Sequence, residues 1–475
     1  MSSPLFNPTL SRRKLLGATL AAGAGVAMGS MVPGAGRAVA QDAMSDDVAN
    51  RAYNQRFLKV PATRLAPTTP DAVHTAMQDV IGQGAPFTIQ SSGHCFAGLS
   101  QTTGTLIDLR ALNSVAVNEA TQTVTVGPGT TIGQVNQATR PFGLALPAGY
   151  CQTVALGGHA SGGGAGVLGR SYGYACDNML AARLVTADGA LLDVDANSHS
   201  DLFWALRGGG AASFGVVVGY TFALHRPGAV TQLEAGVRLS VEQAALWLAI
   251  YQDVVEATSG AVSFNIYLTN VDGARVGLRV RLVANGAEAE ARDALATINA
   301  RAGLAFDPTT DQTGAFHDTA DRMWSPDYYG GASAQYRSDF LGRHMEPQNW
   351  YQSLRIMADN RRLGLSFSLE ALGGAMDAMA PIDTAFVHRR AARQLVQYKA
   401  IINTELPSTP RLTALAHLQE TLRAFTTGGA FFNYPETDRP NWQLAYWGQN
   451  FERLQQVKRA YDPGNVFRHA LSIPV

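Results

Sequence analysis

The segment from Cys151 to Gly166 constrains this 475-residue chain more than any other part of its sequence. It reads Cys-Gln-Thr-Val-Ala-Leu-Gly-Gly-His-Ala-Ser-Gly-Gly-Gly-Ala-Gly. Glycine at this density lets backbone N–H groups turn inward and hold an anion such as a pyrophosphate. Two further glycine turns, at 91–94 and 127–130, lie upstream after short predicted strands. One such turn is usually an ordinary loop, but three within eighty residues predict a phosphate-bearing ligand.

Two alternative interpretations of this region are weaker. Gly164, Gly166 and Gly169 match the dinucleotide fingerprint G-x-G-x-x-G, but glycines precede it and no helical pattern follows. That fingerprint has meaning only between a buried strand and a helix. A zinc site is also disfavoured, because the cysteines and histidines nearby do not show the spacing of zinc ligands, and we expect no metal. Those residues are His94, Cys95, Cys151, His159 and Cys176.

The first forty residues predict an export signal. Arg12 and Arg13 lie in Ser-Arg-Arg-Lys-Leu-Leu, which resembles a twin-arginine motif, and Ala38-Val-Ala40 is a small-x-small cleavage site. A membrane anchor is the alternative, but glycines and Pro33 interrupt the apolar stretch. We therefore expect residues 1–40 to be a twin-arginine signal peptide. The mature protein is then secreted or periplasmic, with no membrane attachment after cleavage.

The charge and cysteine content narrow the function classes. The chain has 37 basic and 37 acidic residues, and loss of the four basic residues of the signal leaves 33 against 37. Nucleic-acid binding would require a basic excess on one face, so no such partner is expected. Three cysteines in an exported protein cannot form a complete disulfide framework, which leaves at least one sulfur for another purpose. The sequence gives no indication of an oligomeric state.

The pattern of strands and helices predicts an α+β fold with two regions. From about residue 50 to 225, short strands alternate with short helices around the glycine turns. After Pro227 the glycine clusters become sparse, and the pattern favours an antiparallel sheet with helices on one face. The helices are expected near 241–258, 287–301, 346–359 and 450–461, and the strands near 262–268, 276–283, 364–372 and 394–402.

A series of motifs in one order along the mature chain supports a family resemblance. They are Ser91-Ser-Gly-His94, Cys151-Gln-Thr-Val with Gly157-Gly-His159, Arg170-Ser-Tyr-Gly, Asp201-Leu-Phe-Trp204, Phe214-Gly-Val-Val217, Thr384-Ala-Phe-Val-His-Arg389, Asn433-Tyr434-Pro435, Tyr446-Trp-Gly-Gln-Asn450 and Asp462-Pro463 through Ser472-Ile-Pro474. In these motifs the chain resembles the berberine-bridge-enzyme-like FAD-linked oxidases, whose FAD-binding fold is of the vanillyl-alcohol-oxidase type.

The resemblance implies a two-part FAD-binding domain, formed by residues 50–225 and completed by the C-terminal segment 426–475. A substrate domain at 226–425, with the antiparallel sheet and helices, packs against it. The resemblance also implies FAD bonded twice, through the imidazole of His94 and the thiol of Cys151. The remaining cofactor-binding residues are expected to be Ser91, Ser92, Gly93, Gly127, Gly129, Thr130, Gly157, Gly158, Ser161, Gly162, Gly163, Gly164, Val217 and Asn433.

Three further residues are expected at the reaction centre because they match family positions. Tyr434 is expected to act as the base, Gln397 to line the pocket, and Val154 to govern the access of O₂ to the reduced flavin. A tyrosine with its ordinary pKa near 10 needs a neighbouring charge or hydrogen bond to serve as a base. Some positions depart from the family pattern: Gln90, Ser92, Cys95, and Ala165 in place of a frequent aromatic residue.

The implied reaction is removal of a proton and a hydride from a hydroxyl-bearing carbon of a small molecule, with O₂ reduced to H₂O₂. A sugar or a glycosylated metabolite is the expected substrate; oxidative cyclisation or desaturation of a secondary metabolite is the alternative. A protein that only bound a ligand would have lost the nucleophiles, and both are present. Candidates for a stacking surface, unless they lie in the core, are Tyr328, Tyr329, Tyr336, Trp350, Trp442 and Trp447.

Overall fold

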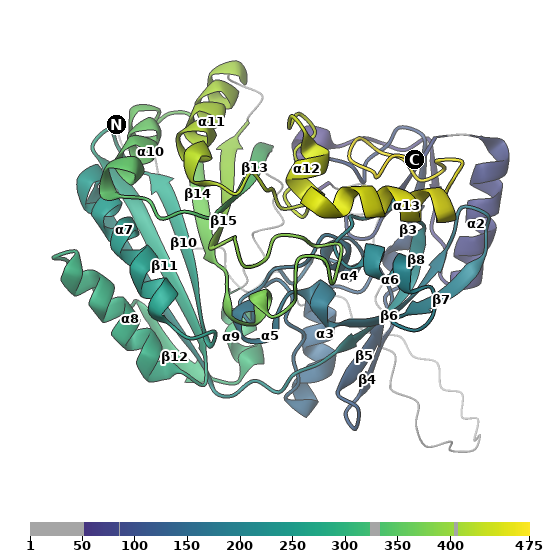
Figure 1. Ribbon diagram of the computed structural model, residues 1–475, viewed down its shortest axis with the longest axis horizontal. Helices are drawn as coiled ribbons and strands as arrows, with labels where there is room; N and C mark the ends of the chain where they lie inside the picture. Colours follow the sequence, from purple (N-terminus) through teal and green to yellow (C-terminus); the bar gives the residue numbers. More distant parts are fainter. Residues whose placement is uncertain (1–51, 85, 324–332, 403–406) are drawn as a thin grey trace, which may run out of the picture. The chain divides into compact units, whose positions relative to one another are not determined.

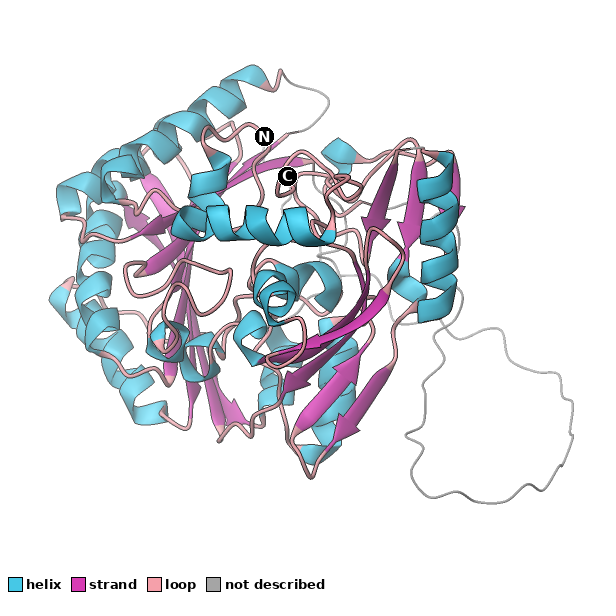
Figure 2. Cartoon of the chain, turned by 45° about the vertical axis from the view of Figure 1, so that its right-hand side comes forward, coloured by secondary structure: helices cyan, strands magenta, loops and turns pink. Residues whose placement is uncertain are grey.

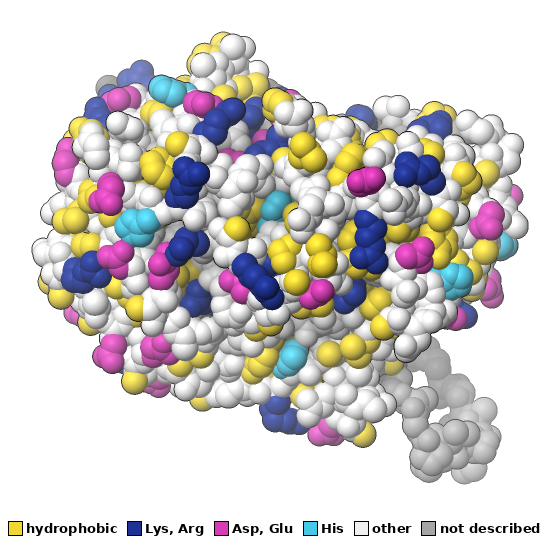
Figure 3. All heavy atoms as spheres, viewed as in Figure 1, with side chains coloured by type: hydrophobic (Ala, Val, Ile, Leu, Met, Phe, Trp, Pro, Cys, Tyr) yellow, Lys and Arg dark blue, Asp and Glu magenta, His cyan; other side chains and the backbone are white. Residues whose placement is uncertain are grey.

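The computed structural model describes residues 52–475 apart from 85, 324–332 and 403–406. The expected export signal therefore lies outside the described residues. Three β-sheets organise the described part of the chain (Figure 1). In that part, no helix has both the length and the apolar character needed to cross a membrane. Basic and acidic side chains are interspersed over the face shown in Figure 3.

Two small sheets carry the glycine turns. A five-stranded antiparallel sheet has the order β4-β5-β8-β6-β7, and a parallel sheet has the order β1-β3-β2. Strand β8 lies at the centre of the five-stranded sheet. Its alternate residues from Val216 to Phe222 are buried, so one face of the strand packs into the core. The elements are β1 (Thr63–Leu65), α2 (Pro70–Gln83), β2 (Phe87–Gln90), β3 (Thr105–Asp108), β4 (Val115–Asn118), β5 (Thr123–Val126), α3 (Ile132–Thr139), α4 (Leu156–Ser161), α5 (Gly169–Tyr172), β6 (Met179–Val185), β7 (Leu191–Asp195), α6 (Ser200–Leu206) and β8 (Val216–Ala223).

A seven-stranded sheet forms the second region, with the order β12-β9-β11-β10-β14-β15-β13 and antiparallel pairing throughout. Helices α7, α8, α10 and α11 cover one face and enclose a large apolar core (Figure 2). The α+β fold class expected from the sequence is confirmed. The elements are β9 (Val230–Ser240), α7 (Val241–Ala257), β10 (Val262–Asn270), β11 (Arg275–Asn285), α8 (Glu288–Arg301), β12 (Thr310–Gly314), α9 (Phe316–Met323), β13 (Ala334–Leu341), α10 (Pro347–Asp359), β14 (Leu365–Ala371), β15 (Gln394–Ile401) and α11 (Thr409–Leu422).

The other face of this sheet is polar along β10 and β14. In β14, Leu365, Phe367 and Leu369 point into the helix-covered core, so the residues between them point to the opposite side. The strand register places Gln397 of β15 beside Ser368, and Ser368 beside Tyr267 of β10. Tyr267 Oη lies 2.9 Å from Tyr150 Oη, immediately before Cys151. The polar face is therefore turned toward the long glycine segment.

The C-terminal segment returns to the N-terminal region. Helices α12 (Trp442–Trp447) and α13 (Phe451–Tyr461) contribute to the apolar core that contains α6 (Figure 1). The fully buried ammonium of Lys458 donates hydrogen bonds to the carbonyls of Ser213 at 2.7 Å and Phe467 at 2.6 Å, and to the Asp462 carboxylate at 2.6 Å. This buried ion pair attaches the last residues of the chain to a loop more than 200 positions earlier.

Candidate active site

Two nucleophilic side chains from separate loops meet at one hydroxyl group. His94 lies in the loop that follows β2, and Cys151 lies in the loop that precedes α4. His94 Nε2 is 3.0 Å from Thr153 Oγ1, and Cys151 Sγ is 3.5 Å from the same oxygen. The fold therefore brings together the imidazole and the thiol that are 57 positions apart in the sequence.

The surroundings of His94 keep its imidazole neutral. Burial lowers the pKa of His94 to about 4, because a charged ring loses hydration there. The ring stacks on Tyr53, with the centroids 4.8 Å apart and the planes inclined by 26°. A neutral imidazole has a nitrogen lone pair at neutral pH, and so it can act as a nucleophile.

Three chain segments meet at Gly157, where a side chain would not fit. A Cβ atom at Gly157 would lie 2.3 Å from Ser91 Oγ and 2.9 Å from the Pro128 carbonyl oxygen. The Gly157 N–H donates to that carbonyl at 3.0 Å, and the Ala155 N–H donates to Ser92 Oγ at 2.9 Å. The turns at 91–94, 127–130 and 151–164 are therefore in direct contact, as a shared binding site for one extended ligand requires.

Asn433 connects the C-terminal segment to the same place. Its Oδ1 accepts the Gly164 N–H at 3.0 Å, and its Nδ2 donates to the Gly158 carbonyl at 3.2 Å. A Cβ atom at Gly162 would lie 2.4 Å from Asn433 Nδ2, and Gly164 has a φ of +80°, a conformation that strongly favours glycine. The C-terminal segment thus helps to shape the glycine-rich backbone.

Several of the expected cofactor-binding residues use their polar groups within the protein. Ser161 Oγ donates to the Gly157 carbonyl at 2.7 Å, and Thr130 Oγ1 donates to the Ser114 carbonyl at 3.0 Å. The glycines of the second turn are explained by close approach to other backbone, because Cβ atoms at Gly127 and Gly129 would meet carbonyl oxygens at 2.1 and 2.3 Å. Among the other expected cofactor-binding residues, Gly93 and Gly163 have φ angles of +78° and +117°, and Val217 is half-buried in β8.

The expected base, Tyr434, has an acidic partner that sequence reasoning missed. Tyr434 lies in the loop that follows β15 and α11, and its hydroxyl donates to Glu370 Oε1 at 3.1 Å. Burial raises the pKa of Glu370, whereas the bond from Tyr434 lowers it. The only sequence signal for Glu370 was its position in β14, where polar and apolar residues alternate and Glu370 is one of the polar ones. Gln397 lies on the same face of the sheet, two positions along β15 from Lys399.

Aromatic stacking at the site involves different residues from most of those expected. Tyr336 stacks on Phe96 at 4.1 Å, and Phe96 stacks on Tyr434 at 5.5 Å. Trp350 and Trp447 are fully buried in the two large cores, so their assignment to a stacking surface was wrong. Their burial could not be read from residue type. Trp442 is half-buried against Trp447, and Tyr328 and Tyr329 lie outside the described residues.

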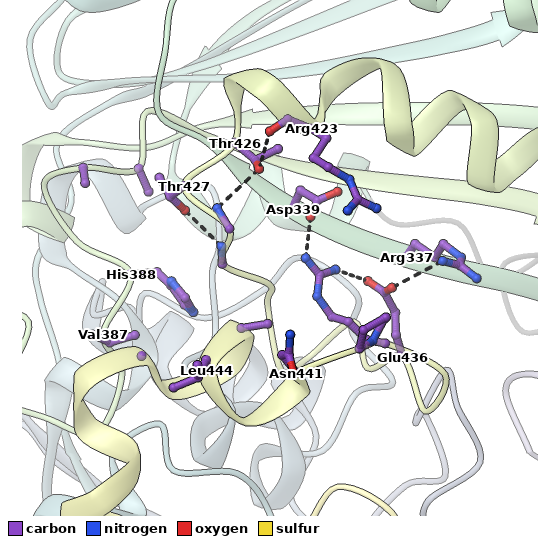
Figure 4. A pocket seen from close by; sticks show the side chains of 18 of the residues that line it. Arg337, Asp339, Val387, His388, Arg423, Thr426, Thr427, Glu436, Asn441 and Leu444 are labelled. Atoms are coloured by element: carbon purple, nitrogen blue, oxygen red, sulfur yellow. Dashed lines mark hydrogen bonds and ion pairs between the residues drawn. The ribbon is translucent and has the colours of Figure 1, made fainter.

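A cavity of about 620 Å³ is lined by Arg337 and Asp339 of β13 together with His388 and Thr427 (Figure 4). Arg439 donates to Asp339 at 2.6 Å and to Glu436 at 2.9 Å in its wall. Glu436 also accepts the Ser338 N–H at 2.7 Å, and burial raises the pKa of Glu436 to about 7. These bonds hold the loop at Glu436, two residues beyond Tyr434, so the cavity borders the support of Tyr434 and not Tyr434 itself.

Comparisons with known proteins agree with this arrangement. Residues 61–195 match the family described as FAD binding domain, and residues 430–474 match the family described as berberine and berberine like. An FAD-linked oxidoreductase of Gibberella zeae is 30% identical over 80% of this chain and 70% of its own length. Reticuline oxidase of Eschscholzia californica is 26% identical over 90% and 86%. A solved structure, Physcomitrella patens BBE-like 1, is 25% identical over 90% and 95%, with a TM-score of 0.81.

The fold and the matched families define an FAD-dependent oxidoreductase. Within that class, the chain belongs to the berberine-bridge-enzyme-like FAD-linked oxidases. The residues present fit FAD, because a Cβ atom at Gly158 would meet nothing within 4 Å, which leaves this exposed part of the glycine backbone open to a pyrophosphate, and because His94 and Cys151 meet at Thr153 Oγ1. Among the described residues, no group of acidic, histidine or cysteine side chains is arranged to hold a metal ion.

His159 should make the stability of this region depend on pH. Burial lowers its pKa to about 4, and its Nε2 accepts the Gly149 N–H at 3.0 Å, which only an unprotonated nitrogen can do. The unfolded chain binds this proton near pH 6.5, so the free energy of unfolding should fall as the pH drops from 6.5 toward 4. His159→Gln keeps an acceptor that does not titrate. Thermal melting should show a smaller loss of Tm between pH 6.5 and 4.5 in the variant; parallel profiles would contradict this role.

Proposed function

We propose that FAD is bonded covalently to this protein through both His94 and Cys151. The observation that carries the proposal is the convergence of the imidazole and the thiol on one hydroxyl, at 3.0 and 3.5 Å. A neutral imidazole and a thiolate are suitable nucleophiles toward an electron-poor ring. Two bonds would hold the flavin in place beside the polar face of the seven-stranded sheet, where a substrate can approach.

The reaction proposed is oxidation of a hydroxyl-bearing carbon. Bound FAD supplies a two-electron acceptor for hydride. Tyr434 Oη accepts the substrate hydroxyl proton while the tyrosine proton moves to Glu370 Oε1, 3.1 Å away. Burial favours the protonated form of this carboxyl and so improves it as the final proton acceptor. The pair thereby overcomes the poor basicity of an isolated tyrosine at neutral pH.

A sugar or a glycosylated metabolite is the substrate that the site favours. Gln397 and Ser368 offer amide and hydroxyl groups on the polar face, which suit a ligand rich in hydroxyls. A chitooligosaccharide oxidase of Gibberella zeae is 28% identical over 89% of both chains, which supports this choice. The stacked pair Tyr336 and Phe96 favours the second candidate, cyclisation or desaturation of an aromatic metabolite. Peroxide release with oligosaccharides and with aromatic glycosides distinguishes the two.

Covalent attachment is tested by acid precipitation of the purified protein. Flavin should remain with the pellet, because acid does not break the two proposed bonds. His94→Ala and Cys151→Ala should each keep one covalent link, and the double variant should release all of its flavin. The measurement is flavin absorbance in pellet and supernatant. Release of free FAD from the unmodified protein would refute the proposal.

The proton path is tested with Tyr434→Phe and Glu370→Gln. Loss of the phenol should lower kcat by about 10²- to 10⁴-fold, the usual contribution of a positioned base. Glu370→Gln keeps the size and a hydrogen bond but cannot take the proton, so it should also lower kcat and shift its pH dependence. The rate of flavin reduction by substrate is measured by stopped flow for both variants over a range of pH. The matched control is Glu420→Gln, an exposed carboxylate on α11. Unchanged flavin reduction in Tyr434→Phe would exclude the tyrosine as base.

Oxygen is the proposed electron acceptor, with Val154 beside its path. One additional methylene in a packed wall can occupy the space that a diatomic molecule needs. Val154 follows Cys151 by three positions and packs against the core of the N-terminal region. Val154→Leu should slow reoxidation of the reduced enzyme by O₂ at least tenfold, about 1.4 kcal/mol of barrier, and leave reduction by substrate nearly unchanged. Equal reoxidation traces in stopped flow would remove Val154 from this role.

Export by the twin-arginine route is proposed from Arg12-Arg13 and Ala38-Val-Ala40. This route carries folded proteins, which suits an enzyme that acquires its cofactor before export. Replacing both arginines by lysine should leave uncleaved precursor in the cytoplasm. Fractionation followed by immunoblotting makes the measurement, and normal secretion of the double-lysine variant would be evidence against the signal.

A further inference from the structure

Thr153 contacts both of the expected flavin attachment residues. Its Oγ1 lies 3.0 Å from His94 Nε2 and 3.5 Å from Cys151 Sγ, within hydrogen-bond range for nitrogen and for sulfur. The backbone around it is a tight turn, in which the Val154 N–H donates to the Cys151 carbonyl at 3.2 Å. The turn therefore places the hydroxyl between the two nucleophiles.

A single hydroxyl has one proton to donate, so Thr153 Oγ1 donates to one of these two atoms and accepts from the other. If His94 Nε2–H donates to Oγ1, the hydroxyl proton points to Sγ. The imidazole proton is then held on Nε2, so the nucleophilic lone pair is on Nδ1. In the same arrangement the Thr153 hydroxyl donates a hydrogen bond to Cys151 Sγ.

We propose that Thr153 is the positioning residue for both covalent attachments, because its hydroxyl orients the imidazole of His94 and hydrogen-bonds to the sulfur of Cys151. The inference rests on the proposed bicovalent FAD. In each attachment, one N–H or S–H and one flavin C–H are replaced by a C–N or C–S bond. The two electrons and two protons released reduce one O₂ to H₂O₂, so Thr153 neither gains nor loses a proton overall.

The test measures attachment at each residue and does not depend on turnover. Peptides containing His94 and Cys151 are quantified by mass spectrometry, with and without flavin, in the purified holoenzyme. Thr153→Val keeps the branched shape but removes the hydroxyl, and both peptides should lose flavin at least tenfold. Thr153→Ser keeps the hydroxyl and should restore attachment at both. Thr125→Val, at an exposed threonine of β5, is the matched control and should leave both peptides unchanged.

Thr153→Ala is a second variant in case valine disturbs the turn, and it should also lose attachment at both residues while still binding FAD that acid releases. Wild-type occupancy in Thr153→Val and Thr153→Ala would overturn the role of Thr153. Loss at one peptide only, or failure of Thr153→Ser to restore attachment, would also overturn it. Absence of flavin from both peptides of the unmodified protein would instead overturn the proposed bicovalent FAD, so the two failures are distinguishable.

Discussion

The close approach of side-chain-free backbone at Gly157 and Gly162 is the constraint on which the site depends. Ser91, Pro128 and Asn433 occupy the space that Cβ atoms would take at these two positions. A methyl group at Gly157 would push apart three N-terminal segments, and one at Gly162 would displace Asn433 of the C-terminal segment. The C-terminal segment takes part in this contact through Asn433, and Lys458 of α13 holds the same segment to Ser213 of the N-terminal region.

The arrangement divides the chemistry between regions that meet at the polar face of the large sheet. His94 and Cys151 come from N-terminal loops, whereas Tyr434 follows Asn433 directly and receives its carboxylate partner from β14. The same short loop therefore contacts the glycine segment and brings the Tyr434 hydroxyl to Glu370. A shift of this loop would disturb the glycine-rich backbone and the Tyr434–Glu370 hydrogen bond together. The ion pairs of Glu436 and Arg439 behind β13 oppose such a shift.

Patterns that depend on neighbouring residues were predicted well. The helices near 241–258 and 346–359 agree with α7 and α10 to within a residue or two, because their periodicity is local. Stacking residues were predicted poorly, since Trp350 and Tyr336 are both large and aromatic. Only packing places Trp350, on the buried face of α10, in the core and Tyr336 against Phe96. Glu370 was missed because its partner depends on a loop 64 positions away.

The sequence by itself determined the α+β fold class, the family of FAD-linked oxidases, and the choice of His94, Cys151 and Tyr434 as candidate site residues. Motif residues and glycine spacing are properties of the chain order. The tertiary structure decided which groups touch. In it, His94 and Cys151 contact Thr153 Oγ1, and Tyr434 pairs with Glu370. Trp350 and Trp447 are buried in the cores. The physical reason is that strand register and the return of the C-terminal segment are set by burial of apolar surface over the whole fold, and no local pattern encodes the resulting distances.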